Sequence, residues 1–238
     1  LTEEAIVAIL KELDPHSAYI SKEDVEKANE PLVGSFEGIG VTFQIFQDTI
    51  LVISPVPGGP SDRVGIMAGD KIVTIDGEDA FGKKVNNDYV AKHLRGEKGT
   101  KVTLGIKRGK TDELIDYEVI RDKIPLNSIE AAFMLDKNVG YIKLDRFAQT
   151  SNTEFEESLA KLKTQKMKSL ILDLRGNTGG YLNIAAELSN QFLKKDMTIV
   201  FTEGDKSPKQ IFNTDKNGKF TDGKLVVLID EGSASASE

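Results

Sequence analysis

The chain has 238 residues, enough for one large domain or two of ordinary size, and its 39% hydrophobic and 29% charged content is typical of a globular protein. A net charge of −7 argues against a nucleic-acid partner, whose phosphates attract a basic protein face. The absence of cysteine excludes disulfides, cysteine-ligated zinc and thiol nucleophiles, and leaves the compartment open.

The two ends of the sequence have no start or stop signals. The chain begins at Leu1 without a methionine, and Glu238 falls in what the pattern predicts to be the first turn of a helix. We therefore expect the polypeptide to continue at both ends. No apolar run approaches the roughly 20 residues that a membrane-spanning helix needs.

Residues 1–33 are predicted to form a short N-terminal helical segment. Ile6, Ile9 and Leu10 recur at helical spacing, and Asp14-Pro15 should end that helix. A second, charged helix can follow from Ser21.

Residues 34–122 are predicted to form a compact β-rich domain with one helix. Short β-branched runs alternate with turn signals such as Asp76-Gly77 and Arg108-Gly109. The expected strands cover residues 40–46, 49–54, 71–75, 101–106 and 115–120, and the expected helix covers 87–94.

Strand and helix patterns alternate over residues 123–238, which predicts an α/β layer with a largely parallel sheet. Residues 213–223, rich in Asn, Asp, Gly and Lys, are expected at a hairpin tip. The expected strands cover residues 138–144, 169–174, 198–202 and 224–229, the second and last of them buried, and the expected helices cover 151–163 and 181–193.

Two loops of small residues carry the strongest chemical signal. Residues 175–180 and 231–238 each follow a predicted buried strand, and α/β sheets place their sites beyond the carboxyl ends of parallel strands. A serine at such a junction can act as a nucleophile beside backbone N–H groups that stabilise an oxyanion. Taken alone, the serines could simply cap a helix, and Gly179-Gly180 could simply form a tight turn. Together the loops favour a site.

The general base is not evident from the residues alone. Of the two histidines, His16 follows the helix-breaking Asp14-Pro15, and His93 lies on the helix of the β-rich domain next to Leu94. Both positions favour a structural or solvated histidine over a catalytic one. A lysine whose pKa is lowered by burial is the alternative partner for a serine, and the sequence does not single one out.

Segments across nearly the whole chain resemble the carboxyl-terminal processing peptidases, also called tail-specific proteases. The two loops, as parts of 170–180 and 232–238, resemble the signature segments of that family. Gly176 and Thr178 stand where the family often has Asn and Pro. Five further segments agree in the same order: 13–19, 38–41, 68–77, 95–100 and 141–147.

This resemblance implies an α/β protease core of crotonase/ClpP-like type, with an inserted β-rich PDZ domain and the short N-terminal helical segment. It makes Ser235 the catalytic nucleophile, and the N–H groups of Gly179, Gly180 and Ala236 the oxyanion hole. The family's general base is a lysine that would follow Glu238, so the 238 residues alone are expected to have little activity. The resemblance also implies a bacterial periplasmic or cell-envelope location after export.

The PDZ resemblance assigns a peptide-binding groove to the β-rich domain. PDZ domains bind an extended peptide C-terminus by strand addition, with backbone N–H groups on its carboxylate. The residues implied are Gly38, Ile39, Gly40, Val41, Val90 and Leu94. For Val90 and Leu94, a place in the domain's own core is an equal alternative. The expected partners are C-terminal tails of protein substrates ending in nonpolar residues, and homo-oligomerisation is left open.

Two other functions compete with a peptidase that cleaves near C-termini. One is an inactive family member that uses its PDZ domain as a peptide-binding scaffold, and the other is an acyl-CoA enzyme of the crotonase type. No nucleotide is implied, because residues 77–84 have the spacing of a phosphate loop but carry Lys84 where that loop needs Ser or Thr. No cofactor or metal is expected either, since the acidic residues after Asp215 are wrongly spaced for a calcium loop.

Overall fold

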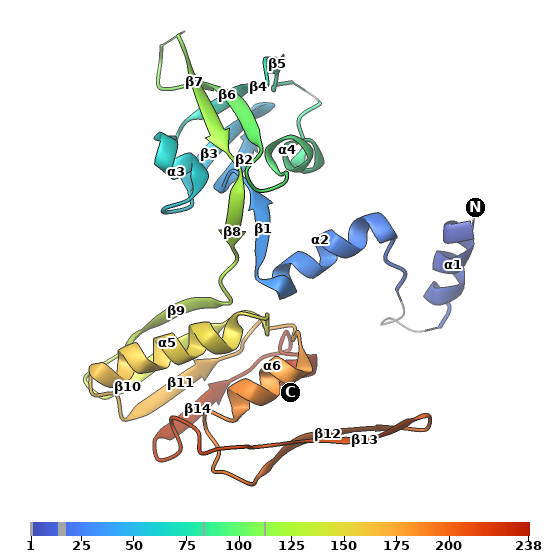
Figure 1. Ribbon diagram of the computed structural model, residues 1–238, viewed down its shortest axis with the longest axis vertical. Helices are drawn as coiled ribbons and strands as arrows, with labels where there is room; N and C mark the ends of the chain where they lie inside the picture. Colours follow the sequence, from blue (N-terminus) through green and yellow to red (C-terminus); the bar gives the residue numbers. More distant parts are fainter. Residues whose placement is uncertain (1, 14–17, 83, 112) are drawn as a thin grey trace. The chain divides into compact units, whose positions relative to one another are not determined.

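The computed structural model describes residues 2–13, 18–82, 84–111 and 113–238, and the chain divides into two compact units (Figure 1). The β-rich unit is Ser35–Leu126, and the α/β unit combines Leu1–Gly34 with Asn127–Glu238. The two units have separate hydrophobic cores. The β-rich unit is therefore an insertion into the chain of the α/β unit.

Two helices begin the α/β unit, α1 (Thr2–Lys11) and α2 (Lys22–Val33). The expected break at Asp14-Pro15 and His16 lie outside the described residues. None of the α1 side chains is buried, whereas the end of α2 is tied down by a 2.8 Å hydrogen bond from Gln149 N–H to Leu32 O. The division into units thus groups residues 1–34 with the α/β part of the chain.

A four-stranded sheet forms the centre of the α/β unit. Its order is β14-β11-β10-β9, with β10, β11 and β14 parallel and β9 antiparallel to β10. The parallel arrangement agrees with the sequence, whereas β9 was not predicted. The strands are β9 (Ile129–Met134), β10 (Val139–Leu144), β11 (Ser169–Asp173) and β14 (Lys224–Leu228).

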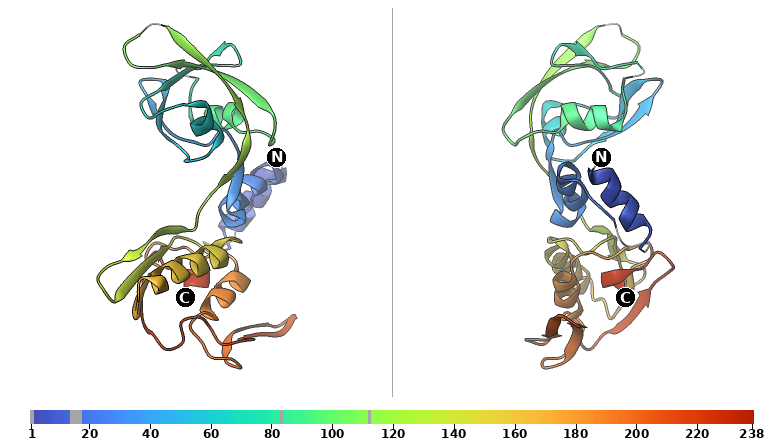
Figure 2. Two further views of the ribbon diagram at one scale, coloured as in Figure 1. Left: turned by 60° about the vertical axis from the view of Figure 1, so that its left-hand side comes forward. Right: turned by 90° about the vertical axis from the view of Figure 1, so that its right-hand side faces the viewer.

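Helices α5 (Ser151–Thr164) and α6 (Leu182–Ser189) lie side by side against one face of this sheet (Figure 2). Phe155, Leu159 and Leu162 recur every three or four residues of α5 and are at most 1% exposed. They pack with Ile142 of β10 and Leu170 of β11. These contacts hold the crossover from β10 to β11 against the sheet, so the ends of both strands are fixed.

Two expectations for the end of the chain were wrong. The hairpin is β12 (Thr198–Gly204) paired with β13 (Ser207–Asn213) as a separate two-stranded ribbon, so residues 213–223 are its exit and not its tip. Strand β14 is not buried, because it is the edge strand of the sheet with β11 as its described neighbour. Val226 and Val227 are 52% and 44% exposed.

The β-rich unit is built on a sheet of order β2-β3-β4-β6-β7, with β5 paired to β4. A separate antiparallel pair joins β1 to β8, so the strands by which the chain enters and leaves the unit are neighbours. This pairing extends the unit past the expected boundary at residue 122. The strands are β1 (Ser35–Gly38), β2 (Val41–Phe46), β3 (Thr49–Pro55), β4 (Lys71–Ile75), β5 (Glu78–Asp79), β6 (Lys101–Lys107), β7 (Leu114–Ile120) and β8 (Asp122–Pro125).

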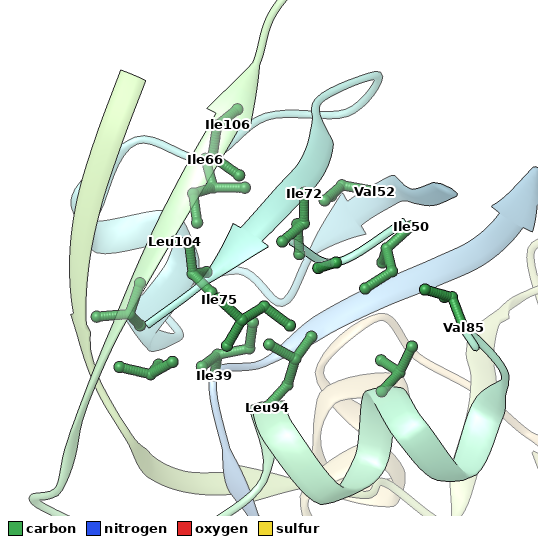
Figure 3. Close-up of a cluster of buried hydrophobic side chains, with 14 residues drawn as sticks. Ile39, Ile50, Val52, Ile66, Ile72, Ile75, Val85, Leu94, Leu104 and Ile106 are labelled. Atoms are coloured by element: carbon green, nitrogen blue, oxygen red, sulfur yellow. The ribbon is translucent and has the colours of Figure 1, made fainter. Parts of the chain in front are cut away.

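Two helices accompany this sheet, the unpredicted α3 (Pro60–Val64) and the predicted α4 (Asn87–Leu94). Helix α3 begins at a proline in its first turn and ends at Gly65 with φ of 91°, a left-handed cap that glycine adopts without strain. Side chains of α4 enter the core beside Ile39 and Ile50 (Figure 3). Alternating residues of β3, β4 and β6 complete that core.

Candidate active site and peptide groove

Three loops begin at the same edge of the α/β sheet, because β10, β11 and β14 are parallel and in register. Lys143 pairs with Asp173, and Asp173 pairs with Leu228, at the carboxyl ends of the three strands. The glycine loop, defined here as residues 174–181, and the serine segment, residues 229–238, therefore start side by side. Leu174 N–H donates to Leu228 O at 2.9 Å and continues the ladder into the loops.

The hydroxyl groups of the three serines differ in their partners. Ser233 Oγ donates to Leu174 O at 2.8 Å, and Ser237 Oγ donates to Asn177 O at 2.8 Å. The Oγ of Ser235 has no hydrogen-bond partner among the residues that the structure describes, and Ser235 is exposed. Capping and packing therefore account for Ser233 and Ser237 but not for Ser235.

The backbone at Ser235 is in the left-handed region, with φ of 57°. A residue with a Cβ atom pays roughly 1–2 kcal/mol for this conformation, and such strain gathers at functional sites. Ala234, just before it, is extended, and the short 3₁₀ turn η1 (Ser235–Ser237) follows. The sharp change from extended chain to helical turn pushes the Ser235 side chain outward.

The glycine pair lies directly against the serine segment. Gly179 has φ of 105°, and a Cβ atom on it would stand 2.8 Å from Ala234 O and 3.0 Å from Ala236 N. Gly180 has φ of 143°, and a Cβ atom there would collide with the backbone of Phe147. Both positions need glycine for conformation and for space.

Of the three N–H groups assigned to an oxyanion hole, the one on Gly179 is already used. It donates to Asn177 Oδ1 at 2.8 Å. The N–H groups of Gly180 and Ala236 have no acceptor within the described part of the chain. The N–H groups of Gly180 and Ala236 therefore remain as candidate donors to an oxyanion. The N–H of Gly179, which was expected to be a third donor, is not available.

Asp230 clamps the two loops together. Its Oδ1 accepts from Gly176 N–H at 2.8 Å and from Gly232 N–H at 3.0 Å. The hydrogen bond from Gly176 lowers the pKa of this carboxyl, with Gly232 and Ser233 adding to the effect. One carboxylate therefore sets the spacing between the glycine loop and the serine segment.

The implied peptide groove of the β-rich unit is bounded by β2 and α4. Strand β2 is an edge strand of its sheet, so one side of it is not paired within the described chain. Just before β2, Gly38 forms an isolated antiparallel bridge with Arg95, which follows α4. The Gly38–Val41 segment therefore lies beside the end of α4, as a PDZ groove requires.

The side chains assigned to the pocket wall are mostly core. Ile39, Val90 and Leu94 are 2%, 1% and 4% exposed and belong to the main hydrophobic cluster of the unit. Figure 3 shows Ile39 and Leu94 in this cluster. Val41 is half-buried at the rim of that cluster. Val90 and Leu94 could have been either pocket walls or core residues. In this conformation they are core residues.

Two family matches divide the chain as its two units do. Peptidase family S41 matches residues 138–238, and the PDZ domain matches residues 38–119. A probable CtpA-like serine protease of Staphylococcus haemolyticus is 36% identical over 240 residues, which cover 100% of this chain and 47% of that protein. The carboxy-terminal processing protease CtpA of Bacillus subtilis is 35% identical over 239 residues, which cover 100% of this chain and 50% of that protein.

The chain thus combines a segment of peptidase family S41 with a PDZ domain. It spans about half the length of these curated relatives. Among solved structures, a PDZ domain of a carboxy-terminal protease from Vibrio cholerae, in complex with peptide, is 33% identical over 39% of this chain and 99% of that one, with a TM-score of 0.35.

An ion pair between the half-exposed Arg175 and a buried carboxylate lies at the start of the glycine loop. Arg175 contacts Asp173 through Nη2 at 2.6 Å, and Tyr141 donates its hydroxyl to the same carboxylate at 2.6 Å. The Asp173 side chain is 0% exposed. Its pKa is lowered strongly, first by the Arg175 hydrogen bonds and then by Tyr141, which together outweigh burial. The carboxylate stays ionised and fixes the start of the loop.

Within the described α/β unit, no side chain forms a hydrogen bond with Ser235 Oγ. His93 lies in the PDZ domain, where Nδ1 is 2.7 Å from Tyr89 O and the two rings are 4.1 Å apart. Lys143, at the end of β10, donates to Arg175 O at 3.0 Å and is engaged there. In the described ranges, no group of three or more acidic or histidine side chains is placed to hold a metal ion.

Two functional candidates were missed in the sequence, Asn177 and Asp230. Asp230 directly follows a predicted strand and lies two residues before Gly232, a turn-like position where an aspartate can bind nearby backbone N–H groups. Asn177 lies in the glycine loop, and no sequence pattern indicated a role for it. No helix among the described residues is both long and apolar enough to span a bilayer.

Proposed function

We propose that the full-length protein is a serine endopeptidase that cleaves protein substrates near their C-termini, with Ser235 as nucleophile. The observation that carries this proposal is the contrast among the three serines. Ser235 alone has an exposed hydroxyl without a described partner, on a left-handed backbone beside two unpaired N–H groups. A hydroxyl that stabilised only the fold would be paired, as those of Ser233 and Ser237 are.

In the proposed reaction, Ser235 Oγ bonds to the carbonyl carbon of the scissile peptide while its proton passes to the general base. The carbonyl π electrons move to the oxygen, which then accepts hydrogen bonds from the N–H groups of Gly180 and Ala236. Collapse of this intermediate breaks the C–N bond, and the base returns the proton to the leaving amine. Water repeats the sequence on the resulting ester, which releases the new carboxyl terminus and restores the serine.

The base in this proposal is a lysine that follows Glu238, as the family resemblance implies. A lysine accepts the serine proton only if burial lowers its pKa toward neutral. The core with β10, β11 and β14 in parallel supports, within the same proposal, the crotonase/ClpP-like fold class. A location at the cell envelope rests on the resemblance alone.

Cleavage of a protein or peptide with a nonpolar C-terminal tail tests the assignment of Ser235 in the full-length protein. Ser235→Ala should lower kcat by at least about 10⁴-fold, because the nucleophile is lost. Ser233→Ala and Ser237→Ala are matched controls in the same segment, and both should keep measurable turnover. Undiminished cleavage by Ser235→Ala would overturn the proposal. An inactive scaffold would show no serine-dependent cleavage in any of the proteins.

The PDZ domain is proposed to dock the substrate's C-terminal tail along the free edge of β2. Strand addition supplies backbone hydrogen bonds, and the Gly38–Val41 turn would face the terminal carboxylate. Because Val90 and Leu94 are almost fully buried, α4 has to move outward to admit the last side chain. Fluorescence anisotropy should show binding of a nonpolar-tailed peptide and loss of binding when its C-terminus is amidated. Equal binding of the amidated peptide would contradict carboxylate capture.

A further inference from the structure

Asn177 is completely buried under the candidate site, and its side chain joins two segments that the mechanism needs. Its Nδ2 donates to Leu144 O at 3.0 Å, and its Oδ1 accepts from Gly179 N–H at 2.8 Å. Leu144 ends β10, so the amide links the sheet edge to the glycine pair. The carbonyl of Leu144 needs a donor and the N–H of Gly179 needs an acceptor, which determines how the amide is oriented.

The backbone of Asn177 holds the other half of the site. Its carbonyl accepts from Ala234 N–H at 3.1 Å and from Ser237 Oγ at 2.8 Å. These two donors flank Ser235 and Ala236 in the serine segment. One buried residue therefore contacts the end of β10, the glycine pair and both sides of the nucleophile, each through a hydrogen bond.

We propose that Asn177 is a positioning residue for the oxyanion hole, an inference that rests on the proposed function. By taking the N–H of Gly179, the side chain orients the peptide unit so that the next N–H, on Gly180, has no acceptor among the described residues. By accepting from Ala234 and Ser237, the backbone carbonyl places Ala236 N–H on the other side of the same space.

An Asn177→Asp substitution separates this role from packing, because it keeps the shape and changes one donor. An aspartate oxygen still accepts from Gly179, but an ionised carboxylate has no donor for Leu144 O and repels that carbonyl. Protonation restores an O–H donor at this position. Since burial raises the pKa of a carboxyl, the protonated form should be populated in mildly acidic solution. The variant's defect should therefore diminish as the pH falls.

The matched control is Asn190→Asp in the same unit. Asn190 is also buried, at 8% exposed, and its Nδ2 donates to Asp215 Oδ1 at 2.9 Å, away from the serine and glycine loops. An aspartate there also loses a donor and faces a negative oxygen. It should destabilise the unit as Asn177→Asp does, without touching the oxyanion hole.

The experiment measures kcat, KM and inhibition by a peptide aldehyde in the full-length protein, with folded protein quantified by circular dichroism. The aldehyde adds to the serine as a tetrahedral species and so reports on the oxyanion hole. At about pH 8, Asn177→Asp should lower kcat by at least about 100-fold and weaken the aldehyde by a similar factor, with KM changed less than about threefold. At about pH 5.5, its kcat relative to wild type should recover at least about tenfold.

Two results would overturn the inference. The first is a folded Asn177→Asp variant whose kcat equals that of wild type. The second is an Asn177→Asp variant whose kcat per folded molecule falls as much as that of Asn190→Asp and does not recover at about pH 5.5. Either result leaves the proposed function intact if Ser235→Ala is inactive. If Ser235→Ala cleaves normally, the proposed function fails instead, so the two failures are distinguishable.

Discussion

Gly179 lies so close to Ser235 that a Cβ atom added to the glycine would stand 2.9 Å from the Cβ of the serine. The two residues are 56 positions apart in the chain, at the ends of neighbouring parallel strands. This approach brings the glycine pair within reach of any group bound at the serine hydroxyl. The activity of the site should therefore depend on the missing side chain at Gly179.

Gly179→Ala should lower kcat by at least about 100-fold, because the added methyl group pushes the serine segment away from the glycine loop. It should also cost roughly 1–3 kcal/mol of stability, since φ of 105° is unfavourable for alanine. Gly77→Ala is the control, with φ of 81° and open space around the added atom. Kinetics of both variants, normalised to folded protein, check this. Full activity in Gly179→Ala would refute the close-approach argument.

Asp230→Ala should lower kcat/KM by about 10-fold or more, because the N–H groups of Gly176 and Gly232 lose their common acceptor. Asp230→Asn keeps an oxygen at the same place and should retain much more activity than the alanine variant. Steady-state kinetics on the three proteins provide the comparison. Equal activity of the alanine variant and wild type would show that the clamp does not set the loop spacing.

The ion pair beneath the glycine loop predicts an acid-dependent stability. The folded-state pKa of Asp173 is depressed, so its contribution is present above the normal carboxyl range and is lost as the pH falls through the folded pKa. The stability difference between wild type and Asp173→Asn should be constant near neutral pH. Below about pH 4 it should shrink by up to about 1.4 kcal/mol per pH unit.

Hydrogen exchange in peptides from β11 measures this local stability, and it avoids assuming that both units unfold together. A difference that grows on acidification would have the wrong sign for a depressed pKa. Tyr141→Phe supplies a second check, because the loss of its hydroxyl donor should weaken the acid dependence.

In the PDZ domain, Arg108→Ala should destabilise the fold by about 3 kcal/mol or more, because Asp70 is 1% exposed and would lose its charged partner. Burial raises the pKa of Asp70, and the hydrogen bonds from Arg108 and Met67 more than offset this, so the net shift is downward. The double variant Asp70→Asn/Arg108→Ala should recover part of the loss. Exchange rates in β6 measure the effect, and no recovery in the double variant would contradict the charge argument.

Much of the architecture could be predicted because it depends on local patterns. β-branched runs separated by Asp76-Gly77 and Arg108-Gly109 indicated the β-rich unit, and buried strands such as Leu170–Leu174 indicated the parallel sheet. Parallel strands end at one edge, so the meeting of the glycine and serine loops followed from the topology. The exposure of β14 could not be predicted, because an apolar run occurs in edge strands as well as in central strands.

The details that distinguish one site residue from its neighbours depend on tertiary contacts. Ser233, Ser235 and Ser237 are equivalent in the sequence, and only their partners in the fold separate them. The use of Gly179 N–H by Asn177 depends on the position of β10, which no local pattern encodes. The burial of Leu94 likewise depends on how α4 packs against Ile39.

Covalent labelling of the full-length protein with a fluorophosphonate, mapped by mass spectrometry, tests the central claim most directly. The account predicts a single phosphonylated serine, Ser235, with labelling unchanged in Ser233→Ala and abolished in Ser235→Ala. The adduct forms at the one of the three serine hydroxyls for which the described residues supply no hydrogen-bond partner, beside the N–H groups of Gly180 and Ala236. Labelling at Ser233 or Ser237, or persistent labelling of Ser235→Ala in the same segment, would contradict the account.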